Sequence, residues 1–304
     1  MNRMRYDSTV MARELTRQQE IERSIFKKYK STLWAPFLSA VNQYELLKEG
    51  DRVAICISGG KDSMLMAKLF QLLQKHSTYP FELVFLMMDP GYSPAHRKQI
   101  EDNAATLGIP LTVFETNIFL VSDTISRKPC YLCARMRRGH LYNKARELNC
   151  SKIALGHHMN DAVETTVMSM FWSSKLETII PKSNSENFEG MELIRPMYRT
   201  REEDILSWCA YNDLHFIQCA CSFTERMAQE DSELTSKRRE TKLLLKELKK
   251  TNPDIEENIF RALHAVQIES FPGYKANHAM HSFLENYSSH GRLITRNDDT
   301  EGSE

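Results

Sequence analysis

The stretch Ser58-Gly59-Gly60-Lys61-Asp62-Ser63 decides the fold of this chain. Uninterrupted apolar residues precede it over 53–57, and apolar residues with helical spacing follow it over 64–73. An apolar run without polar alternation is typical of a strand that is buried on both faces of a parallel sheet. The sequence therefore predicts a central strand, a tight glycine turn and a helix whose first turn holds Asp62 and Ser63.

A glycine turn between a strand and a helix favours the binding of an anion. The free backbone N–H groups and the positive end of the helix dipole both point at such a turn. Gly59 and Gly60 let the backbone approach phosphate oxygens closely, and the side chains of Lys61 and Ser63 can add donors. A Gly-Gly turn without a ligand remains the alternative.

Two common phosphate-binding loops are excluded by the glycine spacing. A Walker A loop requires a glycine five residues before Gly60, where this chain has Ile55. The dinucleotide-binding fingerprint requires glycines at alternate positions followed by a third, and only an adjacent pair is present. The stretch instead resembles the PP-loop of the N-type ATP pyrophosphatases. That resemblance implies cleavage of ATP between its α- and β-phosphates and an adenylated substrate.

The composition sets the broad class of the protein. The 304 residues can form one large α/β domain with smaller helical additions. Lys and Arg number 40, and Asp and Glu also number 40, so any basic surface for nucleic acid must be local. The seven cysteines show no regular pairing, and neither an apolar signal segment nor a membrane-spanning apolar run is present. We therefore expect a cytoplasmic protein without a membrane partner.

Strand and helix patterns alternate regularly after the glycine turn. This alternation predicts an α/β fold with a parallel, doubly wound sheet, and the PP-loop resemblance implies the Rossmann-like HUP type. Helical additions are expected at both ends of the chain. The predicted strands cover 81–88, 111–115, 152–155 and 192–194, and predicted helices cover 95–107 and, after the last of these strands, 202–211.

We expect three segments along the chain. Residues 1–50 form an N-terminal helical segment, and residues 51–221 form the PP-loop ATP pyrophosphatase domain. Residues 222–304 form a C-terminal helical extension with a disordered tail. Within this extension, 236–250 and 255–266 have the pattern of amphipathic helices, which either pack on the catalytic domain or offer a surface to a partner or tRNA.

The ends of the predicted strands carry residues that suit a nucleotide. Asp89, Gly156-His157 and Arg195-Pro196 each stand at such an end. Because the carboxyl ends of parallel strands meet at one edge of a sheet, these residues are expected beside the glycine turn. We predict that Asp89, Gly156 and His157 contact ATP.

Two carboxylates are the candidates for catalysis, Asp62 in the glycine turn and Asp161 at a predicted helix start. Glu164 is spaced to share a helix face with Asp161. Carboxylates at this place could hold Mg²⁺ that bridges the phosphates of ATP, and we assign this role to Asp62 and Asp161. The alternative is an ordinary helix start, since acidic residues in a first turn need no ligand.

A C-x-x-C pair, Cys130 and Cys133, stands at the entrance of a predicted helix. Such a pair can hold one edge of a metal or iron–sulfur site, act as a redox dithiol, or be two buried thiols. Three arginines follow it within a few residues and form a local basic patch, which either meets RNA phosphates or is a solvated helix face. These arginines are Arg135, Arg137 and Arg138.

These motifs, in this order, resemble the TtcA family of iron–sulfur tRNA 2-thiocytidine synthetases within the PP-loop superfamily. The resemblance runs from about Glu49 to Cys221. Besides the glycine turn, it is carried by Glu49-Gly50-Asp51-Arg52-Val53, by Cys-x-x-Cys with Arg135-x-Arg137-Arg138-Gly139 and Leu141-Tyr142, by Ala154-Leu155-Gly156-His157-His158, by Arg195-Pro196, Arg201-Glu202 and Asp204-Ile205, and by a late cysteine.

The resemblance implies an enzyme that thiolates tRNA with ATP. It would adenylate the C2 oxygen of a pyrimidine, namely cytidine 32 of the anticodon loop, and replace this oxygen with sulfur carried by a [4Fe–4S] cluster. Its partners would be tRNA and a sulfur donor (a cysteine desulfurase or sulfide), with a homodimer as one assembly to consider. By the same resemblance ATP and Mg²⁺ are bound by Ser58, Gly59, Gly60, Asp62 and Ser63, and the cluster by Cys130, Cys133 and Cys219.

The chain departs from the family pattern at two places. Asn160-Asp161 replaces the usual Asp-Asp, which leaves Asp161 as the remaining carboxylate. Cys219-Ala220-Cys221 replaces a late C-x-x-C pair and follows a predicted short strand at Phe216-Ile217, so both cysteines could face one site. Cys219 is in register with the first late cysteine of the family, and a fourth thiolate would close the open iron that sulfide needs, so we expect Cys219 to be the third ligand.

Two other classes of function remain open. A PP-loop ligase of the lysidine synthetase type would adenylate a base and attack it with an amine, without a cluster. A non-catalytic zinc module would use Cys130, Cys133, Cys219 and Cys221 as a tetrahedral set, without ATP turnover. The first leaves the C-x-x-C pair unexplained, and the second leaves the glycine turn unexplained.

Overall fold

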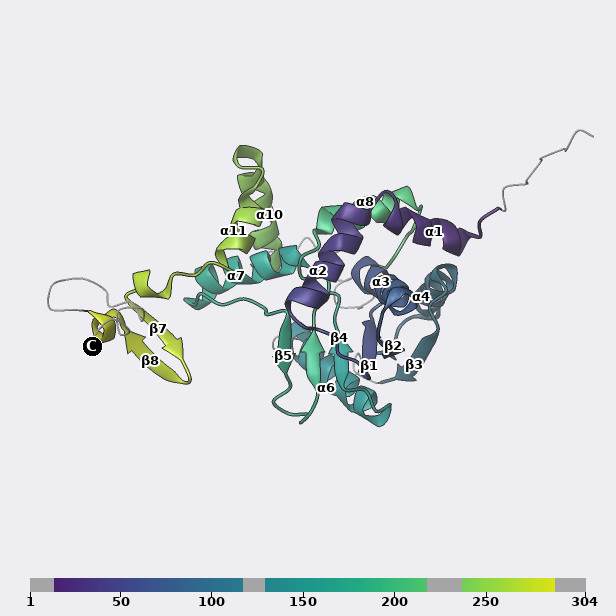
Figure 1. Cartoon of the computed structure of the whole chain (residues 1–304), viewed down its shortest axis with the longest axis horizontal. Coiled ribbons are helices and arrows are strands. Elements are labelled where there is room, and N and C mark those ends of the chain that lie inside the picture. The colour runs from purple at the N-terminus through teal and green to yellow at the C-terminus, as the bar shows by residue number, and fades with distance from the viewer. Residues whose placement is uncertain (1–13, 117–128, 218–236, 288–304) are drawn as a thin grey trace, which may run out of the picture. The chain divides into compact units, whose positions relative to one another are not determined.

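The structure is a computed structural model and describes residues 14–116, 129–217 and 237–287 (Figure 1). The chain divides into two compact units between Leu244 and Leu245, and the first unit contains the large sheet. The segment boundaries expected at residues 50 and 221 stay predictions.

The first unit is built on a six-stranded sheet in the order β3-β2-β1-β4-β6-β5. The five strands from β3 to β6 are parallel, which confirms the predicted doubly wound α/β class. The strand order changes direction at β1 and β4, where ligands bind in such sheets. The strands cover Arg52–Ile57 (β1), Glu82–Asp89 (β2), Leu111–Glu115 (β3), Lys152–Ala154 (β4), Lys182–Asn184 (β5) and Glu192–Ile194 (β6).

The edge strand β5 was not predicted, and it pairs antiparallel with β6. Its three residues, Lys182, Ser183 and Asn184, are polar and carry no periodic signal that would indicate a strand. An antiparallel edge strand is common on an otherwise parallel sheet.

The central strand β1 is buried on both faces, as its uninterrupted apolar run predicted. Val53, Ile55 and Ile57 contribute to one hydrophobic core. Ala54 and Cys56 contribute to a second core on the opposite face. Because side chains alternate between the two faces of a strand, covering both faces with helices requires an apolar residue at every position.

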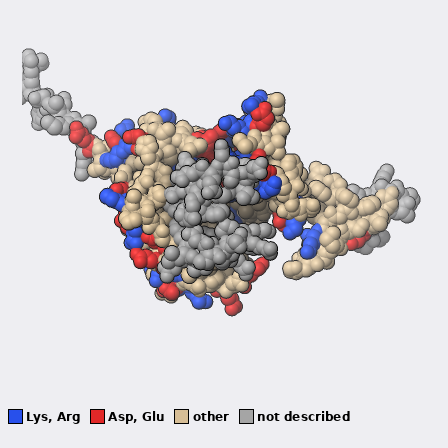
Figure 2. All heavy atoms as spheres, turned by 180° about the vertical axis from the view of Figure 1, so that it is seen from behind, with Lys and Arg blue, Asp and Glu red and all other residues tan. Residues whose placement is uncertain are grey.

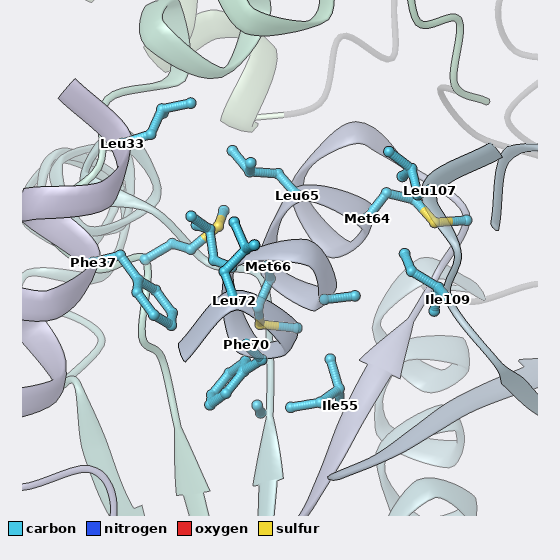
Figure 3. Packing of buried hydrophobic residues seen from close by; sticks show 14 of the residues in the cluster. Leu33, Phe37, Ile55, Met64, Leu65, Met66, Phe70, Leu72, Leu107 and Ile109 are labelled. Atoms are coloured by element: carbon cyan, nitrogen blue, oxygen red, sulfur yellow. The ribbon is translucent and has the colours of Figure 1, made fainter. Parts of the chain in front are cut away.

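The larger core lies between the sheet and helix α3 (Lys61–His76), which packs on β1 and β2. Figure 3 shows Leu65, Met66 and Phe70 of α3 packed with Phe37, which precedes the sheet in the chain, and with Ile55 of β1. Helix α4 (Pro94–Leu107) adds Ile100 and Leu107 and ends at Gly108, whose φ of +65° is left-handed. Helix α8 (Glu202–Tyr211) adds the fully buried Trp208.

The N-terminal helices cover this core, as the sequence indicated. Helix α1 (Arg17–Phe26) begins with a capping box formed by Thr16 and Gln19. It is followed by a π-helical turn at Lys30–Trp34 and by helix α2 (Ala35–Gln43).

The opposite face of the sheet is covered by helix α6 (Pro129–Glu147), which packs on β2 and β4. Its residues Tyr142 and Ala145 are buried against Ala54 and Ile153 of the sheet. Helix α7 (Met159–Ser173) follows β4 in the chain and precedes strands β5 and β6.

Helix α10 (Lys237–Thr251) begins in the first unit and ends in the second. The second unit also contains α11 (Ile255–Ala262), which is shorter than the predicted 255–266, and two short 3₁₀ turns at Ile268–Ser270 and Phe283–Asn286. Its antiparallel hairpin of β7 (Gly273–Ala276) and β8 (Ala279–Ser282) was not predicted.

Within the part of the chain that the structure describes, no helix is both long enough and apolar enough to span a membrane. On the face seen in Figure 2, the basic and acidic side chains of the described residues are interspersed. This distribution agrees with the balanced charge of the chain.

Candidate functional site

The glycine turn lies between the end of β1 at Ile57 and the start of α3 at Lys61, as predicted. Ser63 Oγ donates to the carbonyl oxygen of Gly60 at 2.9 Å and accepts from the backbone N–H of Ser58 at 3.1 Å. The Ser58 hydroxyl donates to Ser63 Oγ at 3.1 Å. The two predicted serines therefore brace the turn around the open N-terminus of α3.

Gly59 must be a glycine for two reasons. Its φ of +84° lies in the left-handed region, which side chains with a Cβ rarely adopt. A Cβ atom at this position would also lie 2.6 Å from Cγ1 of Ile100 and 2.9 Å from Cδ1 of Ile217. The turn is thus closely packed on its outer side, where Ile217 brings a distant part of the chain against it.

Lys61 and Asp62 form an ion pair at the start of α3, with 3.1 Å between Lys61 Nζ and the carboxylate. Lys61 Nζ also lies 3.0 Å from Oε1 of Glu202, at the start of α8. Burial opposes the charged form of Lys61, but the two carboxylates raise its pKa above the ordinary value. Lys61 is therefore held as a cation at the start of α3.

Gly156 lies directly against the glycine turn. A Cβ atom at this position would be 3.1 Å from the backbone nitrogen of Ser63 and 3.1 Å from the carbonyl carbon of Asp62. The end of β4 and the start of α3 consequently pack backbone to backbone. The predicted proximity of Gly156 to the turn is therefore observed, and its reason is a close approach between two backbones.

His158 stands between the two predicted catalytic carboxylates. Its Nε2 lies 3.9 Å from Oδ1 of Asp62, and its Nδ1 lies 3.5 Å from Oδ2 of Asp161. Asp161 Oδ2 also accepts from the backbone N–H of His158 at 3.0 Å. Asp62 and Asp161 are thus brought together around one buried imidazole, which the sequence did not single out.

The two carboxylates differ in how fully the protein satisfies them. Burial alone would raise the pKa of Asp161, but the neighbouring His158 and its backbone N–H lower it below the ordinary value. Asp62 Oδ1 makes no hydrogen bond within the described residues, although Lys61 Nζ lies 3.1 Å from it. Its hydrogen-bonding capacity is therefore not fully used, which leaves it able to contact a further donor or cation.

His157 is neutral at physiological pH. Burial lowers its pKa to about 4, and the nearby Arg195 opposes its charged form further. Its Nδ1 has no hydrogen-bond partner in the described part of the chain. The predicted contact of His157 with ATP stays a prediction, and it would be made by a neutral imidazole.

Asn160 replaces a family carboxylate, and its amide has a structural partner. Its Oδ1 accepts from the backbone N–H of Glu202 at 2.9 Å. Glu202 is the first residue of α8, so Asn160 satisfies one of the free N–H groups at that helix start. This contact positions Glu202 beside Lys61.

Four further charged residues belong to the site, and our sequence-based site assignment did not include them. Glu164 has a nearly buried carboxylate, and burial raises its pKa to about 7 although neighbouring cations oppose the shift. The others come from segments far along the chain, which no local motif connects with the glycine turn. The four residues are Glu164 of α7, Glu202 of α8, and Arg238 and Lys242 of α10.

Asp89 lies at the end of β2, as predicted, but its oxygens are used within the protein. Oδ1 accepts from the backbone N–H groups of Gly91 and Tyr92, both at 2.8 Å. Oδ2 pairs with Arg97 at 3.1 Å. These contacts shape the turn after β2, and the predicted contact of Asp89 with ATP stays untested.

The predicted RNA-binding arginines lie on α6. Arg137 donates to the hydroxyl of Tyr92 at 3.1 Å, and this hydroxyl donates to the carbonyl oxygen of Ser58 at 3.4 Å. Arg138 is exposed and contributes, after burial, to lowering the pKa of Arg195 to about 10. Arg137 is thus linked to the glycine turn through a single side chain. The side chain of Arg135 is outside the described residues.

The structure describes only part of the predicted cysteine site. Cys130 and Cys133 lie in the first turns of α6, which confirms a helix at the C-x-x-C pair, but their side chains are not described. Cys219 and Cys221 lie outside the described residues. The strand predicted at Phe216-Ile217 is wrong, because these residues have no strand pairing and Ile217 packs beside Gly59 instead.

No group of three or more His, Cys, Asp or Glu side chains among the described residues is arranged to hold a metal ion alone. The carboxylates of Asp62 and Asp161 lie on opposite sides of His158, so a metal would need further oxygen ligands, such as those of phosphate. The arrangement therefore suits a metal that arrives together with a nucleotide.

The chain is similar to known proteins over most of its length. A family model described as a PP-loop domain matches residues 26–227, and α10 lies beyond this region. The tRNA-cytidine(32) 2-sulfurtransferase of Geotalea uraniireducens is 32% identical over 252 residues, which are 81% of this chain and 94% of that protein. The protein of the same name from Vibrio cholerae is 32% identical over 281 residues, which are 90% of this chain and 84% of that protein.

One solved structure shares the fold. The U34-tRNA thiolase NcsA from Methanococcus maripaludis, determined with its [4Fe-4S] cluster, aligns with a TM-score of 0.60 and 19% sequence identity. The alignment covers 84% of this chain and 82% of that chain.

Proposed function

The chain belongs to the PP-loop family and, within it, to the family of the tRNA-cytidine(32) 2-sulfurtransferases, and we propose that it replaces the C2 oxygen of a tRNA cytidine with sulfur at the expense of ATP. The observation that carries this proposal is the braced glycine turn at the end of β1, with Asp62 and Asp161 gathered around His158. This turn is the element that a PP-loop enzyme needs to hold the phosphates of ATP.

The proposed role of the turn is to bind and orient ATP. The N–H groups at the start of α3 and the cation of Lys61 would contact the phosphates, with Gly59 and Gly60 allowing their close approach. A pyrimidine C2 carbonyl lacks a good leaving group, and transfer of AMP to its oxygen creates one while pyrophosphate departs. The chain contributes mainly positioning and charge stabilisation to this step.

Asp62 and Asp161 are the residues that would hold Mg²⁺. Both are carboxylates, which are the ligands that this cation prefers, and the side chain of Asp62 is 29% exposed, so an ion can reach it. The residues present therefore fit the ion. When bound, Mg²⁺ would neutralise charge on the phosphates of ATP.

The iron–sulfur cluster would be held by Cys130, Cys133 and Cys219. Cys130 and Cys133 are three residues apart on α6 and therefore lie on one face of this helix. Ile217, the last described residue before Cys219, packs against the glycine turn, and Cys219 itself lies outside the described residues. Thiolates are the usual ligands of such clusters, and the cluster would supply the sulfur chemistry.

Two basic surfaces support the binding of tRNA. One carries the predicted arginines of α6, with Arg137 next to the glycine turn through Tyr92. The other is a groove of about 710 Å³ between α1 and the end of α8, where Lys28 lies 3.8 Å from the ring centroid of Tyr211. We further propose a cysteine desulfurase or sulfide as sulfur donor, a cytoplasmic location and a homodimer as the assembly to test first.

The nature of the products tests this proposal. Protein purified without oxygen is incubated with Mg²⁺, ATP, a sulfide source and tRNA, and both the nucleotide and the RNA are analysed. We expect AMP, pyrophosphate and a tRNA in which one cytidine carries sulfur. Formation of ADP and phosphate contradicts the PP-loop mechanism, and an amine adduct on the base indicates a ligase of the lysidine synthetase type.

Cysteine variants test the proposed ligands of the cluster. Cys219→Ser should lose iron and acid-labile sulfide, while Cys221→Ser should keep both and lose at most part of the activity. The opposite result makes Cys221 the ligand. Loss in both variants indicates a closed site of four cysteines, and bound zinc without ATP turnover indicates a structural module.

A further inference from the structure

Helix α10 brings two cations into the acidic part of the site. Arg238 Nε lies 3.2 Å from Oε2 of Glu164, and Arg238 Nη2 lies 3.5 Å from Oδ1 of Asp161. Lys242 Nζ lies 3.4 Å from Oε1 of Glu164 and 3.2 Å from Oε2 of Glu202. The two cations are four residues apart, so they share one face of α10.

Lys242 lies close to the lysine of the glycine turn. Lys61 and Lys242 contact the two different oxygens of the same carboxylate, that of Glu202, at 3.0 and 3.2 Å. Glu202 in turn is positioned by Asn160. The cations of α10 are therefore part of one connected cluster with the turn, although α10 begins after the region of the sequence resemblance.

The charges of this cluster would disfavour a nucleotide if α10 did not contribute. Its carboxylates are Asp62, Asp161, Glu164 and Glu202, and Lys61 is the cation of the turn itself. ATP brings several further negative charges, and like charges at these distances repel one another strongly when partly buried. With Lys61, Arg238 and Lys242 supply three cations against the four carboxylates, so they remove most of the negative charge that would repel an anion.

Both cations keep donors available for a ligand. The side chains of Arg238 and Lys242 are 47% and 46% exposed. A guanidinium group carries five N–H donors and an ammonium group carries three, more than the observed carboxylate contacts use. We propose that Arg238 and Lys242 bind the pyrophosphate group of ATP and stabilise it as it leaves.

This inference rests on the proposed function for the identity of the nucleotide, and its chemistry follows from the bond that breaks. The C2 oxygen of the base forms a bond to the α-phosphorus, and the bond from this phosphorus to the oxygen of the β-phosphate breaks. The electron pair of the broken bond stays on the leaving pyrophosphate, so negative charge increases there. A guanidinium and an ammonium group at this place therefore bind the leaving pyrophosphate more tightly than they bind ATP.

Direct binding of pyrophosphate tests this assignment separately from turnover. Calorimetric titration of pyrophosphate with Mg²⁺ into the cluster-containing protein is compared for the wild type, Arg238→Met, Lys242→Met and a control. The control is Lys237→Met, on the same helix, whose partner is Glu240. We expect each of the two site variants to bind pyrophosphate about 10- to 100-fold more weakly, since the loss of a hydrogen bond to a charged group weakens binding by about this factor. The affinity of the control should remain within about twofold of the wild type.

Charge-retaining variants distinguish ligand binding from a role in packing alone. Arg238→Lys and Lys242→Arg should recover most of the lost affinity, and the Met variants should raise the KM for ATP with little change in the melting temperature. The proposal is overturned if both Met variants bind pyrophosphate like the wild type, or if they lose affinity for tRNA but not for pyrophosphate. If the wild type forms ADP while the variants still lose affinity for pyrophosphate, the proposed function fails and the anion site stands.

Discussion

Two clusters of opposite charges lie along helix α3, and they are built differently. In the middle of the helix, Lys68 is fully buried and lies 2.9 Å from the carboxylate of Glu22 on α1. Lys75 binds the same carboxylate from the surface, at 3.1 Å. At the start of the helix, Lys61 pairs with Glu202 at 3.0 Å, and about a quarter of each side chain is exposed.

The two clusters differ in whether their polar atoms all make hydrogen bonds. Glu22 accepts hydrogen bonds from Lys68, Lys75 and Gln18. Around the start of α3, by contrast, Asp62 Oδ1 and His157 Nδ1 make no hydrogen bond within the described residues, although Lys61 Nζ lies 3.1 Å from Asp62 Oδ1. A closed ion pair fixes one helix on another, whereas an open cluster retains the capacity to bind something else.

The largest effect on stability is expected from Glu22→Ala. The variant leaves the ammonium group of Lys68 buried without its carboxylate, which costs about 3–5 kcal/mol of the free energy of unfolding. Urea unfolding measures this loss. Lys75→Ala is the control, because its side chain is 53% exposed and such a pair contributes only about 0–1 kcal/mol. Equal losses in both variants would contradict a buried, closed pair.

The same pair predicts an acid sensitivity. Burial alone would raise the pKa of Glu22, but the hydrogen bonds from Lys68 and Gln18 lower it to about 2 from the ordinary 4.5. Because the pKa in the folded state is the lower one, the stabilisation is present above pH 4.5 and is lost as the pH falls toward 2. Over this range the wild type should lose more stability than Glu22→Gln.

The next largest effect is expected from Asp62→Asn, and it concerns activity. Removing this charge should lower kcat for AMP formation by about 100- to 1000-fold, as the loss of one preorganised electrostatic group does. The free energy of unfolding should change little, because Asp62 belongs to the open cluster. The control Asp102→Asn removes an exposed partner of Lys98 on α4 and should leave kcat unchanged. Loss of stability without loss of kcat would make Asp62 a structural residue.

The sequence was sufficient to predict an element where the pattern that indicates it lies within a few neighbouring residues. The apolar run of β1 and the glycine turn after it predicted the central strand and the start of α3, whereas the bracing of the turn by Ser58 and Ser63 was seen only in the structure. Prediction from the sequence failed where tertiary packing determines the conformation. Phe216-Ile217 has the composition of a strand, but Ile217 packs on the glycine turn. Polar and very short elements such as β5 carry no periodicity that a sequence could reveal.

The open cluster could be predicted only in part for a related reason. Asp62 and Asp161 stand in recognisable positions at a strand end and a helix start. Glu202, Arg238 and Lys242 reach the cluster only because α8 and α10 fold back onto the start of α3 and α7. A charge in a helix pattern normally indicates a solvated face, and no spacing rule connects residues so far apart in the chain.

A smaller effect is expected from Gly156→Ala. The added methyl group would lie about 3.1 Å from the backbone of the glycine turn, so the turn must shift slightly. Overpacking of this kind costs roughly 1–3 kcal/mol. If about 1.4 kcal/mol of this cost falls on ATP binding, the KM for ATP rises tenfold. Gly139→Ala is the matched control, because nothing lies within 4 Å of a Cβ there. An unchanged KM for Gly156→Ala would show that the turn tolerates movement.

The smallest effect is expected from Asn160→Ala, which removes the acceptor for the first N–H of α8. The loss of such an acceptor costs about 1 kcal/mol of the free energy of unfolding, measured by urea denaturation. Asn160→Asp is the informative partner variant, because a carboxylate keeps the acceptor and favours a helix start. It also adds a negative charge beside Glu202, in a cluster where four carboxylates already outnumber the three cations Lys61, Arg238 and Lys242. We therefore expect Asp at this position to keep the stability but to raise the KM for ATP, whereas Ala lowers the stability and changes the KM less. If Ala and Asp behave alike in both measurements, Asn160 acts neither as a helix acceptor nor in the charge balance of the open cluster.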